Sequence, residues 1–376
     1  MTGFLFGAAG MFAVTYSTQA ILPQLGTVFH VSPAHAGLTI SVVVLGLASG
    51  AWIWGPFSDR YGRKRSIVLA CALLVAPTVG TALASSFGLL LAFRAAQGLC
   101  MPGLLTAGVP YVTEVFAPRI GGRAMGHYVT ALIAGGLIGR VGVALVAAAL
   151  GWRWGIGLVA ILPLAAVFVM QRSLVELPRA RTNSSRLQGL GRQIRNPQLL
   201  RATAVGGAFF VTFVSTFSYV VYRLERPPFS LGSSTRGLVF MLWILGVLAP
   251  SIGRLSDRLG WKRLALVALA LAAAGLALSL PASLPTLFVG LALVTLANFG
   301  GVIAAQLGVA EATEVDRGAA AAVYFSLYYL AGAVGAYLPG LAWERFRWDG
   351  VAASGFVVLA LAAAVLVLSG PVAAEH

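Results

Sequence analysis

Charged residues are scarce in this chain of 376 residues, of which only 10% are Asp, Glu, Lys or Arg. An ordinary soluble domain carries roughly 25%. Because 59% of the residues are hydrophobic, so few charges cannot cover the surface of a water-soluble globule of this size. The composition therefore excludes a soluble enzyme.

Cysteine and histidine are also rare. The two cysteines, Cys71 and Cys100, lie in apolar stretches, and the four histidines are scattered along the chain. Neither a disulfide framework nor a cysteine metal site is available. The histidines are too far apart in the sequence to indicate a metal cluster. We therefore expect no metal and no cofactor.

Acidic residues number 11 against 26 basic residues, which gives a net charge of +15. A basic chain can indicate a nucleic-acid partner, but nucleic-acid binders gather Lys and Arg on a solvated patch. Here the basic residues separate apolar runs, which is typical of a protein that crosses a membrane several times. The pattern argues against nucleic acid and predicts a lipid bilayer as the partner.

The apolar runs predict twelve membrane-spanning helices, each of which needs about 20 residues. Uncharged runs cover residues 1–58, 66–93, 95–113, 154–171, 202–222, 237–253, 264–310, 318–343 and 350–374. The run 264–310 would form a helix of about 70 Å, so we expect a turn at 281–285. Polar turns near 31–33 and 85–86 divide two other runs, and 126–150 carries only Arg140. The first run lacks a basic leader, which favours a retained helix over a cleaved signal peptide.

The basic residues are distributed unequally between the two sides of such a membrane protein. If both termini are cytoplasmic, 18 of the 26 fall inside, six fall outside, and Arg94 and Arg140 remain within the spans. Positive charge concentrates on the cytoplasmic side of membrane proteins. We therefore expect a multi-pass membrane protein with both ends in the cytoplasm.

The sequence also contains an internal repeat. The segment 55–65, GPFSDRYGRKR, returns as GRLSDRLGWKR at 253–263, and Thr-Glu-Val at 113–115 returns at 313–315. Near-equal offsets of 198 and 200 residues indicate two six-helix bundles, 1–173 and 199–376, joined by a basic cytoplasmic linker, 174–198. Because each half has an even number of spans, the repeats are parallel, which is a geometry for alternating access.

The repeated loop has a spacing with physical meaning. Glycines allow tight turns and close packing, the aspartate accepts hydrogen bonds from a helix end or a guanidinium, and basic residues hold the loop against anionic inner-face lipids. A generic positive loop explains the arginines but not the glycine and aspartate spacing. The candidate gating residues are Gly55, Asp59, Arg60, Gly62, Arg63 and Lys64, with Gly253, Asp257, Arg258 and Gly260 in the second copy.

This loop resembles the cytoplasmic signature of the major facilitator superfamily, and RAAQG at 94–98 resembles its arginine motif in the fourth helix. The stretches 15–23, 125–140 and 222–228 resemble the YnfM-type, arabinose-efflux-like branch of bacterial inner-membrane exporters. The resemblance implies the twelve-helix all-α fold of two pseudo-symmetric bundles, with proton coupling. It also implies a charge latch of Asp59, Arg63 and Glu114, with Glu314 as the repeat of Glu114. Trp261 replaces Arg63 in the second copy, so the latch is not symmetric.

Two arginines in spans are candidate substrate or proton-coupling residues. An arginine at mid-membrane costs roughly 2.5–3.5 kcal/mol and needs a partner or a watery cavity. Arg94, with Gln97 on the same helix face, and Arg140 are the candidates. The alternative for Arg94 is a packing role with hydrogen bonds to carbonyls, and the alternative for Arg140 is a side chain that snorkels to the outer surface. Arg140 lies where drug exporters of the superfamily carry a Gly-Pro motif. The glycines Gly135, Gly136 and Gly139 are present without the proline, and we interpret them as helix-packing residues.

Polar residues of other spans complete the expected substrate site. We place Tyr16 and Gln19 of the first span in it. The second half offers further candidates, which are more typical of packing when taken singly: Tyr219, Tyr222, Asn298, Gln306, Tyr324 and Tyr328.

All eleven acidic residues fall at the ends of the predicted spans, in loops or in the tail. A site with buried positive charge and no carboxylate is poorly suited to a lipophilic cation. The sequence therefore predicts a secondary active transporter, working as a monomer, that exports a small neutral or anionic solute such as a sugar or an organic acid. The alternatives are a multidrug/proton antiporter and an uncoupled facilitator.

The sequence gives no direct evidence for the coupling. It contains no phosphate-binding loop for ATP, and no catalytic triad or metal-protease motif that would indicate an intramembrane enzyme. Protons are the expected coupling ion, carried by Glu114 or by the substrate itself.

Overall fold

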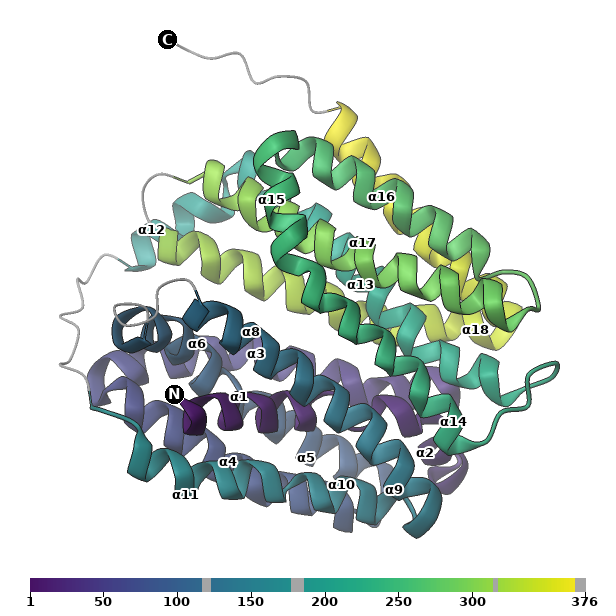
Figure 1. The fold of residues 1–376 in the computed structure, drawn as a ribbon, viewed down its shortest axis with the longest axis horizontal. Helices are drawn as coiled ribbons and strands as arrows, with labels where there is room; N and C mark the ends of the chain where they lie inside the picture. Colours follow the sequence, from purple (N-terminus) through teal and green to yellow (C-terminus); the bar gives the residue numbers. More distant parts are fainter. Residues whose placement is uncertain (117–122, 177–185, 314–316, 369–376) are drawn as a thin grey trace. The chain divides into compact units, whose positions relative to one another are not determined.

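The structure of the protein is a computed structural model that describes residues 1–116, 123–176, 186–313 and 317–368 (Figure 1). Helices and turns make up these residues, and no β-strand occurs among them. The predicted all-α class is confirmed.

The chain divides into two compact units. The first consists of Met1–Asn183 with Val220–Ile244, and the second of Ser184–Tyr219 with Leu245–His376. Residues 220–244 thus pack with the first unit, although they follow the predicted linker. The boundaries 1–173, 174–198 and 199–376 describe the sequence repeat and stay a prediction.

The first unit contains helices that alternate with short irregular segments. They are α1 (Thr2–Thr15), η1 (Gln19–Ile21), α2 (Leu22–Phe29), α3 (Pro33–Tyr61), α4 (Arg63–Leu83), α5 (Phe87–Cys100), α6 (Pro102–Tyr111), η2 (Val112–Phe116), α8 (Arg123–Leu137), η3 (Ile138–Gly142), α9 (Val143–Leu150), α10 (Trp152–Val159), α11 (Ile161–Ser173) and α14 (Ser233–Gly237). Helix α1 packs against α8 and α11 (Figure 1).

The second unit contains the longer helices. They are α12 (Arg186–Ile194), most of α13 (Pro197–Glu225), α15 (Ala249–Leu259), α16 (Trp261–Leu278), α17 (Leu284–Glu311) and α18 (Arg317–Leu368). The 3₁₀ segment η4 (Leu238–Leu248) runs from the first unit into the second. Helices α16 and α17 lie side by side (Figure 1).

Eleven segments of the described residues are long and apolar enough to span a membrane. The last, Arg317–Leu368, has 52 residues and a non-helical kink at Arg347 (φ 54°, ψ −136°). A straight helix of that length would measure about 78 Å, more than twice the hydrocarbon thickness of roughly 30 Å. The kink divides it into two spans, which gives the predicted twelve.

Capping side chains and glycines set the ends of several helices. The hydroxyls of Ser32 and Ser86 accept hydrogen bonds from the third residue of the following helix, which is the normal N-cap arrangement. Gly62 between α3 and α4 has φ 97°, and Gly260 between α15 and α16 has φ 73°. Both sit in the repeated loop, and the positive φ explains why a glycine is needed there.

Small residues bring neighbouring helices into close contact. A Cβ added to Gly135 or Gly139 would collide with the backbone of Ala9 or Ala13 in α1, so the packing interpretation of these two glycines is confirmed. In the second unit, a Cβ on Gly275 of α16 would lie 2.6 Å from the Gly290 carbonyl oxygen of α17. Backbone atoms cannot move aside as a flexible side chain can.

We predict that Gly275→Ala forces α16 and α17 apart and destabilises the protein by about 1–3 kcal/mol, as overpacking does. The measurement is the melting temperature of the purified protein in detergent. Gly318→Ala in α18 is the matched control, since an added Cβ there meets no atom within 4 Å. Equal melting temperatures for the two variants would contradict the packing argument.

Candidate functional site

The first span is a broken helix. Helix α1 ends at Thr15, residues 16–18 form a turn, and the chain continues through η1 into α2. A helix that ends inside a membrane leaves its last carbonyl groups without intrahelical partners, and water is not available to replace them. The break therefore needs buried donors.

Arg94 of α5 supplies these donors. Its side chain is fully buried. Nη1 donates to the Val14 carbonyl oxygen at 2.9 Å, Nη2 to that of Thr15 at 2.6 Å, and Nε to that of Thr39 in α3 at 2.9 Å. The positive charge also lies at the negative end of the α1 dipole. These contacts are those of a helix cap.

Gln97 extends the same network. Its Oε1 accepts a hydrogen bond from Arg94 Nη1 at 2.7 Å, and its Nε2 donates to Thr78 Oγ1 of α4 at 3.1 Å. Arg94 and Gln97 thus join α1, α3, α4 and α5. A direct contact of either residue with substrate stays a prediction.

Arg140 is the second buried arginine, with no exposed surface. It lies in η3, a π-helical segment between α8 and α9. Nε donates to Gln19 Oε1 at 2.7 Å, and Nη1 donates to the Gly136 carbonyl oxygen at 2.9 Å. Nη2 is buried and has no hydrogen-bond partner among the described residues. Arg140 forms no ion pair with any acidic residue that the structure describes.

Aromatic rings surround the Arg140 guanidinium instead of a counter-ion. Its central carbon lies 4.0 Å from the ring centroid of Tyr16, 4.0 Å from that of Trp243, and 5.5 Å from that of Phe240. The Tyr16 and Trp243 rings contact each other edge-on at 5.8 Å. Cation–π contacts of this kind contribute about 2 kcal/mol or more when desolvated. We call Tyr16, Gln19, Arg140, Phe240 and Trp243 the arginine cage.

Every residue of the arginine cage comes from backbone that departs from a regular α-helix. Tyr16 and Gln19 lie at the break of the first span, Arg140 lies in the π-helical η3, and Phe240 and Trp243 lie in the 3₁₀ segment η4. A π-bulge or a long 3₁₀ stretch inside a helix commonly marks a functional position or a hinge. The cage therefore combines a buried charge with adjustable backbone.

Sequence reasoning placed Tyr16, Gln19 and Arg140 in one site, and the structure brings these three together. Phe240 and Trp243 were missed, and the available signal was two aromatic residues inside the apolar run 237–253. Gly136 is closely packed against this site, because an added Cβ would lie 3.0 Å from Arg140 Nη1 and 3.0 Å from the Trp243 ring.

Most of the other polar candidates lie in the second unit. There the Tyr219 hydroxyl donates to the Ala336 carbonyl oxygen at 2.6 Å, and Tyr324 and Tyr328 stack on each other at 5.6 Å. Asn298 and Gln306 belong to α17 of the same unit, whereas Tyr222 belongs to the first.

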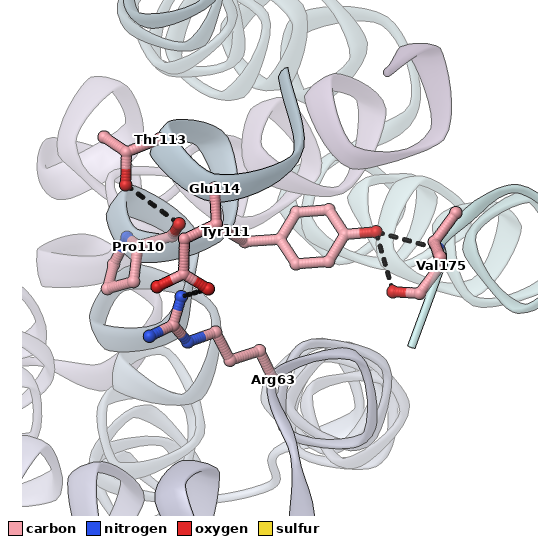
Figure 2. A network of polar contacts seen from close by, with 6 residues as sticks. All are labelled: Arg63, Pro110, Tyr111, Thr113, Glu114 and Val175. Atoms are coloured by element: carbon pink, nitrogen blue, oxygen red, sulfur yellow. Dashed lines mark hydrogen bonds and ion pairs between the residues drawn. The ribbon is translucent and has the colours of Figure 1, made fainter. Parts of the chain in front are cut away.

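A second polar network lies at the other end of the fourth span, where the π-helical η2 follows α6. Arg63 at the start of α4 forms an ion pair with Glu114 of η2 (Figure 2). Close by, the Tyr111 hydroxyl donates to the Val175 carbonyl oxygen at 3.1 Å and accepts from the Val175 amide at 2.8 Å (Figure 2). The network ties the repeated loop to the ends of the fourth and sixth spans.

The remaining gating candidates have varied surroundings. Arg60 lies 5.4 Å from the Tyr61 ring centroid, and Asp59 and Lys64 are half-buried. A Cβ added to Gly55 or Gly253 meets no atom within 4 Å. The close packing expected at Gly55 is therefore wrong, because α3 leaves room there, and its repeat Gly253 in α15 has the same open surroundings.

In the second copy of the loop, Asp257 and Arg258 are exposed, and Gly260 forms the turn. Glu314 lies outside the described residues.

A sequence comparison decides the family. The sequence model of the Major Facilitator Superfamily matches residues 4–246. The MFS-type transporter YybF of Bacillus subtilis is 30% identical over 358 residues, which cover 93% of this chain and 88% of the relative. This chain belongs to the Major Facilitator Superfamily. The inner membrane transport protein YnfM of Escherichia coli is 29% identical, over 96% of this chain and 88% of the relative.

Solved structures of the superfamily share the fold of this member. A bacterial homologue of the human lysosomal transporter Spinster has a TM-score of 0.80 at 19% identity, and the match covers 98% of this chain and 95% of that one. The D-xylose–proton symporter has a TM-score of 0.73 at 16% identity, with 96% of each chain covered. The predicted family and twelve-helix fold are confirmed.

We predict that replacing the two buried arginines of this superfamily member lowers its stability by different amounts. Arg94→Ala removes three buried hydrogen bonds, to the carbonyl oxygens of Val14, Thr15 and Thr39, although that of Val14 still accepts from Ser17. We expect a loss of about 2–4 kcal/mol. Arg140→Ala also removes the desolvation cost of a buried charge without a counter-ion, which offsets part of the lost cation–π and hydrogen-bond contacts, so we expect a smaller loss. The measurement is the melting temperature in detergent. A larger loss for Arg140→Ala would show that the cap assignment is wrong.

Proposed function

We propose that this protein is a secondary active transporter that works by alternating access and exports a small neutral or anionic solute, such as a sugar or an organic acid. Protons are the coupling ion. The chain lies in the bacterial inner membrane with both termini in the cytoplasm and acts as a monomer. Its membership of a family of transporters supports transport in general, and the finer claims rest on the arginine cage and the charge distribution.

The observation that carries the solute class is Arg140 Nη2, a buried guanidinium nitrogen without a hydrogen-bond partner. A carboxylate or a hydroxyl can accept from this donor, and a charge-assisted bond in a dry site is strong. The Tyr16 and Trp243 rings each lie 4.0 Å from the guanidinium carbon and hold this donor in place. A cation would meet repulsion from Arg140.

The acidic residues support the same conclusion. The described ones lie at helix ends or beside the kink of α18, as with Asp59 near the end of α3, Glu225 at the end of α13 and Glu311 at the end of α17. None of them is buried. A carboxylate that could neutralise a cationic substrate within a span is therefore missing from the described residues.

The aromatic rings of the arginine cage favour one alternative, a multidrug/proton antiporter for lipophilic compounds, because flat rings bind such molecules without charge selectivity. The two proposed functions differ in whether transport depends on the Arg140 guanidinium. A lipophilic neutral or cationic cargo would be bound by the rings and would not need the guanidinium.

Transport in liposomes with an internal pH dye tests the proposal. The panel contains organic anions, neutral sugars and lipophilic cations. We expect proton movement with an anion or a sugar. In Arg140→Gln the apparent affinity for that substrate should fall roughly tenfold to hundredfold, since a charge-assisted hydrogen bond contributes about 1.5–3 kcal/mol. The exposed Arg172→Gln is the matched control. Signals from cations alone would overturn the solute class, and solute flux without proton movement would indicate a facilitator.

The ion pair between Arg63 and Glu114 gives a separate prediction about gating. Either Arg63→Glu or Glu114→Arg places like charges together, and we expect slower transport in each. The charge-reversed double variant restores the pair and should recover the rate. Because Glu114 is 47% exposed, we expect each stability change to stay below about 1 kcal/mol. A double variant as slow as the single ones would contradict a role of the ion pair itself.

A further inference from the structure

The second unit contains a cleft of about 130 Å³ where the ends of α13, α16, α17 and α18 meet. Its polar lining consists of Gln198, Arg201, Lys262 and Glu311, and Trp261 forms an aromatic wall beside Gly308. Val365 and Leu366 of α18 close the apolar side. The lining carries two positive charges and one negative charge.

An apolar groove of about 290 Å³ adjoins this cleft at Val365. It runs between α13 and the two parts of α18, and Val365 lines both the groove and the cleft. Its α13 side extends from Leu200 to Val211, which corresponds to about 16 Å along the helix axis. A charged cleft and a long apolar groove thus lie next to each other on one unit of the protein.

We propose that the cleft and the groove together bind an anionic phospholipid, with its phosphodiester in the cleft and an acyl chain in the groove. A phosphodiester carries a single negative charge, which matches the single net positive charge of the cleft. Arg201 and Lys262 attract the phosphate, whereas Glu311 repels the second charge of a free phosphate ion. A soluble anion would leave the apolar groove empty. The neighbouring charged cleft and apolar groove therefore favour a lipid, which has both a charged and an apolar part.

A difference between the two copies of the internal repeat accounts for the aromatic wall of the cleft. In the first half, Arg63 follows the loop glycine and forms an ion pair with Glu114. In the second half, Trp261 takes that place and packs against α17, where a Cβ on Gly308 would be 2.9 Å from the Trp261 ring. Lys262 Nζ lies 5.9 Å from the same ring centroid. Tryptophan is enriched where hydrocarbon meets water in membranes, which fits a wall between headgroup and chain.

Native mass spectrometry of the purified full-length protein in detergent, titrated with phosphatidylglycerol or phosphatidylcholine, tests this site. We expect tighter binding of phosphatidylglycerol. The variant Arg201→Gln with Lys262→Gln should bind it about 30-fold more weakly, because each basic residue near a membrane surface contributes about 1 kcal/mol. Arg192→Gln with Arg254→Gln, which removes two exposed charges outside the cleft, is the matched control and should bind normally.

A second pair of variants tests the groove. Ala204 is exposed and lines it, so Ala204→Phe should obstruct the acyl chain and weaken binding at unchanged charge. Ala270→Phe on the exposed side of α16 should have no effect. The swap of Arg201→Lys with Lys262→Arg keeps the charge and should keep the preference for phosphatidylglycerol.

Three results would overturn the proposal: equal affinity for both lipids, equal weakening in the Arg192 and Arg254 control, or displacement of the lipid by inorganic phosphate at matched concentration. None of these measurements depends on transport, so they test the lipid site independently of the proposed function.

Discussion

The hydrogen bonds from Arg94 to the carbonyls at the end of α1 are the interaction on which the candidate site depends. A helix broken at mid-membrane is unstable unless its free backbone groups find partners. One guanidinium provides several donors in a fixed plane and a charge that no ordinary pH removes. Because the break is satisfied in this way, Tyr16 and Gln19 can leave the helical path and reach Arg140.

Arg140 presents the opposite case, a buried charge with an incomplete set of partners. Aromatic faces and one amide oxygen stabilise it in place of a carboxylate. Such an arrangement is less costly than an isolated charge in hydrocarbon, but it satisfies fewer donors than the Arg94 network does. The two arginines therefore differ in chemistry although both are fully buried. Arg94 uses its donors within the fold, whereas Arg140 keeps one donor that can still form a hydrogen bond.

Hydropathy and the repeat predicted the spans well, because the apolar runs and their turns are local properties of the sequence. The turns at Ser32 and Ser86 and the division near 281–285 all appear in the structure. The site was predicted only in part. Tyr16, Gln19 and Arg140 are polar residues in apolar surroundings and can be recognised, whereas Phe240 and Trp243 resemble their apolar neighbours. Which arginine caps a helix depends on contacts across about 80 residues, and no local pattern reports these.

The two copies of the repeated loop are held by different forces. In the first, Arg63 and Glu114 attract each other across partly exposed surface; in the second, Trp261 packs against Gly308. Counter-ions screen the first interaction over a distance of about 8–10 Å at physiological ionic strength, and they leave the second untouched. Dissolved salt therefore loosens one loop and not the other. The two copies of one sequence repeat therefore differ in how strongly they respond to the ionic strength of the surrounding water.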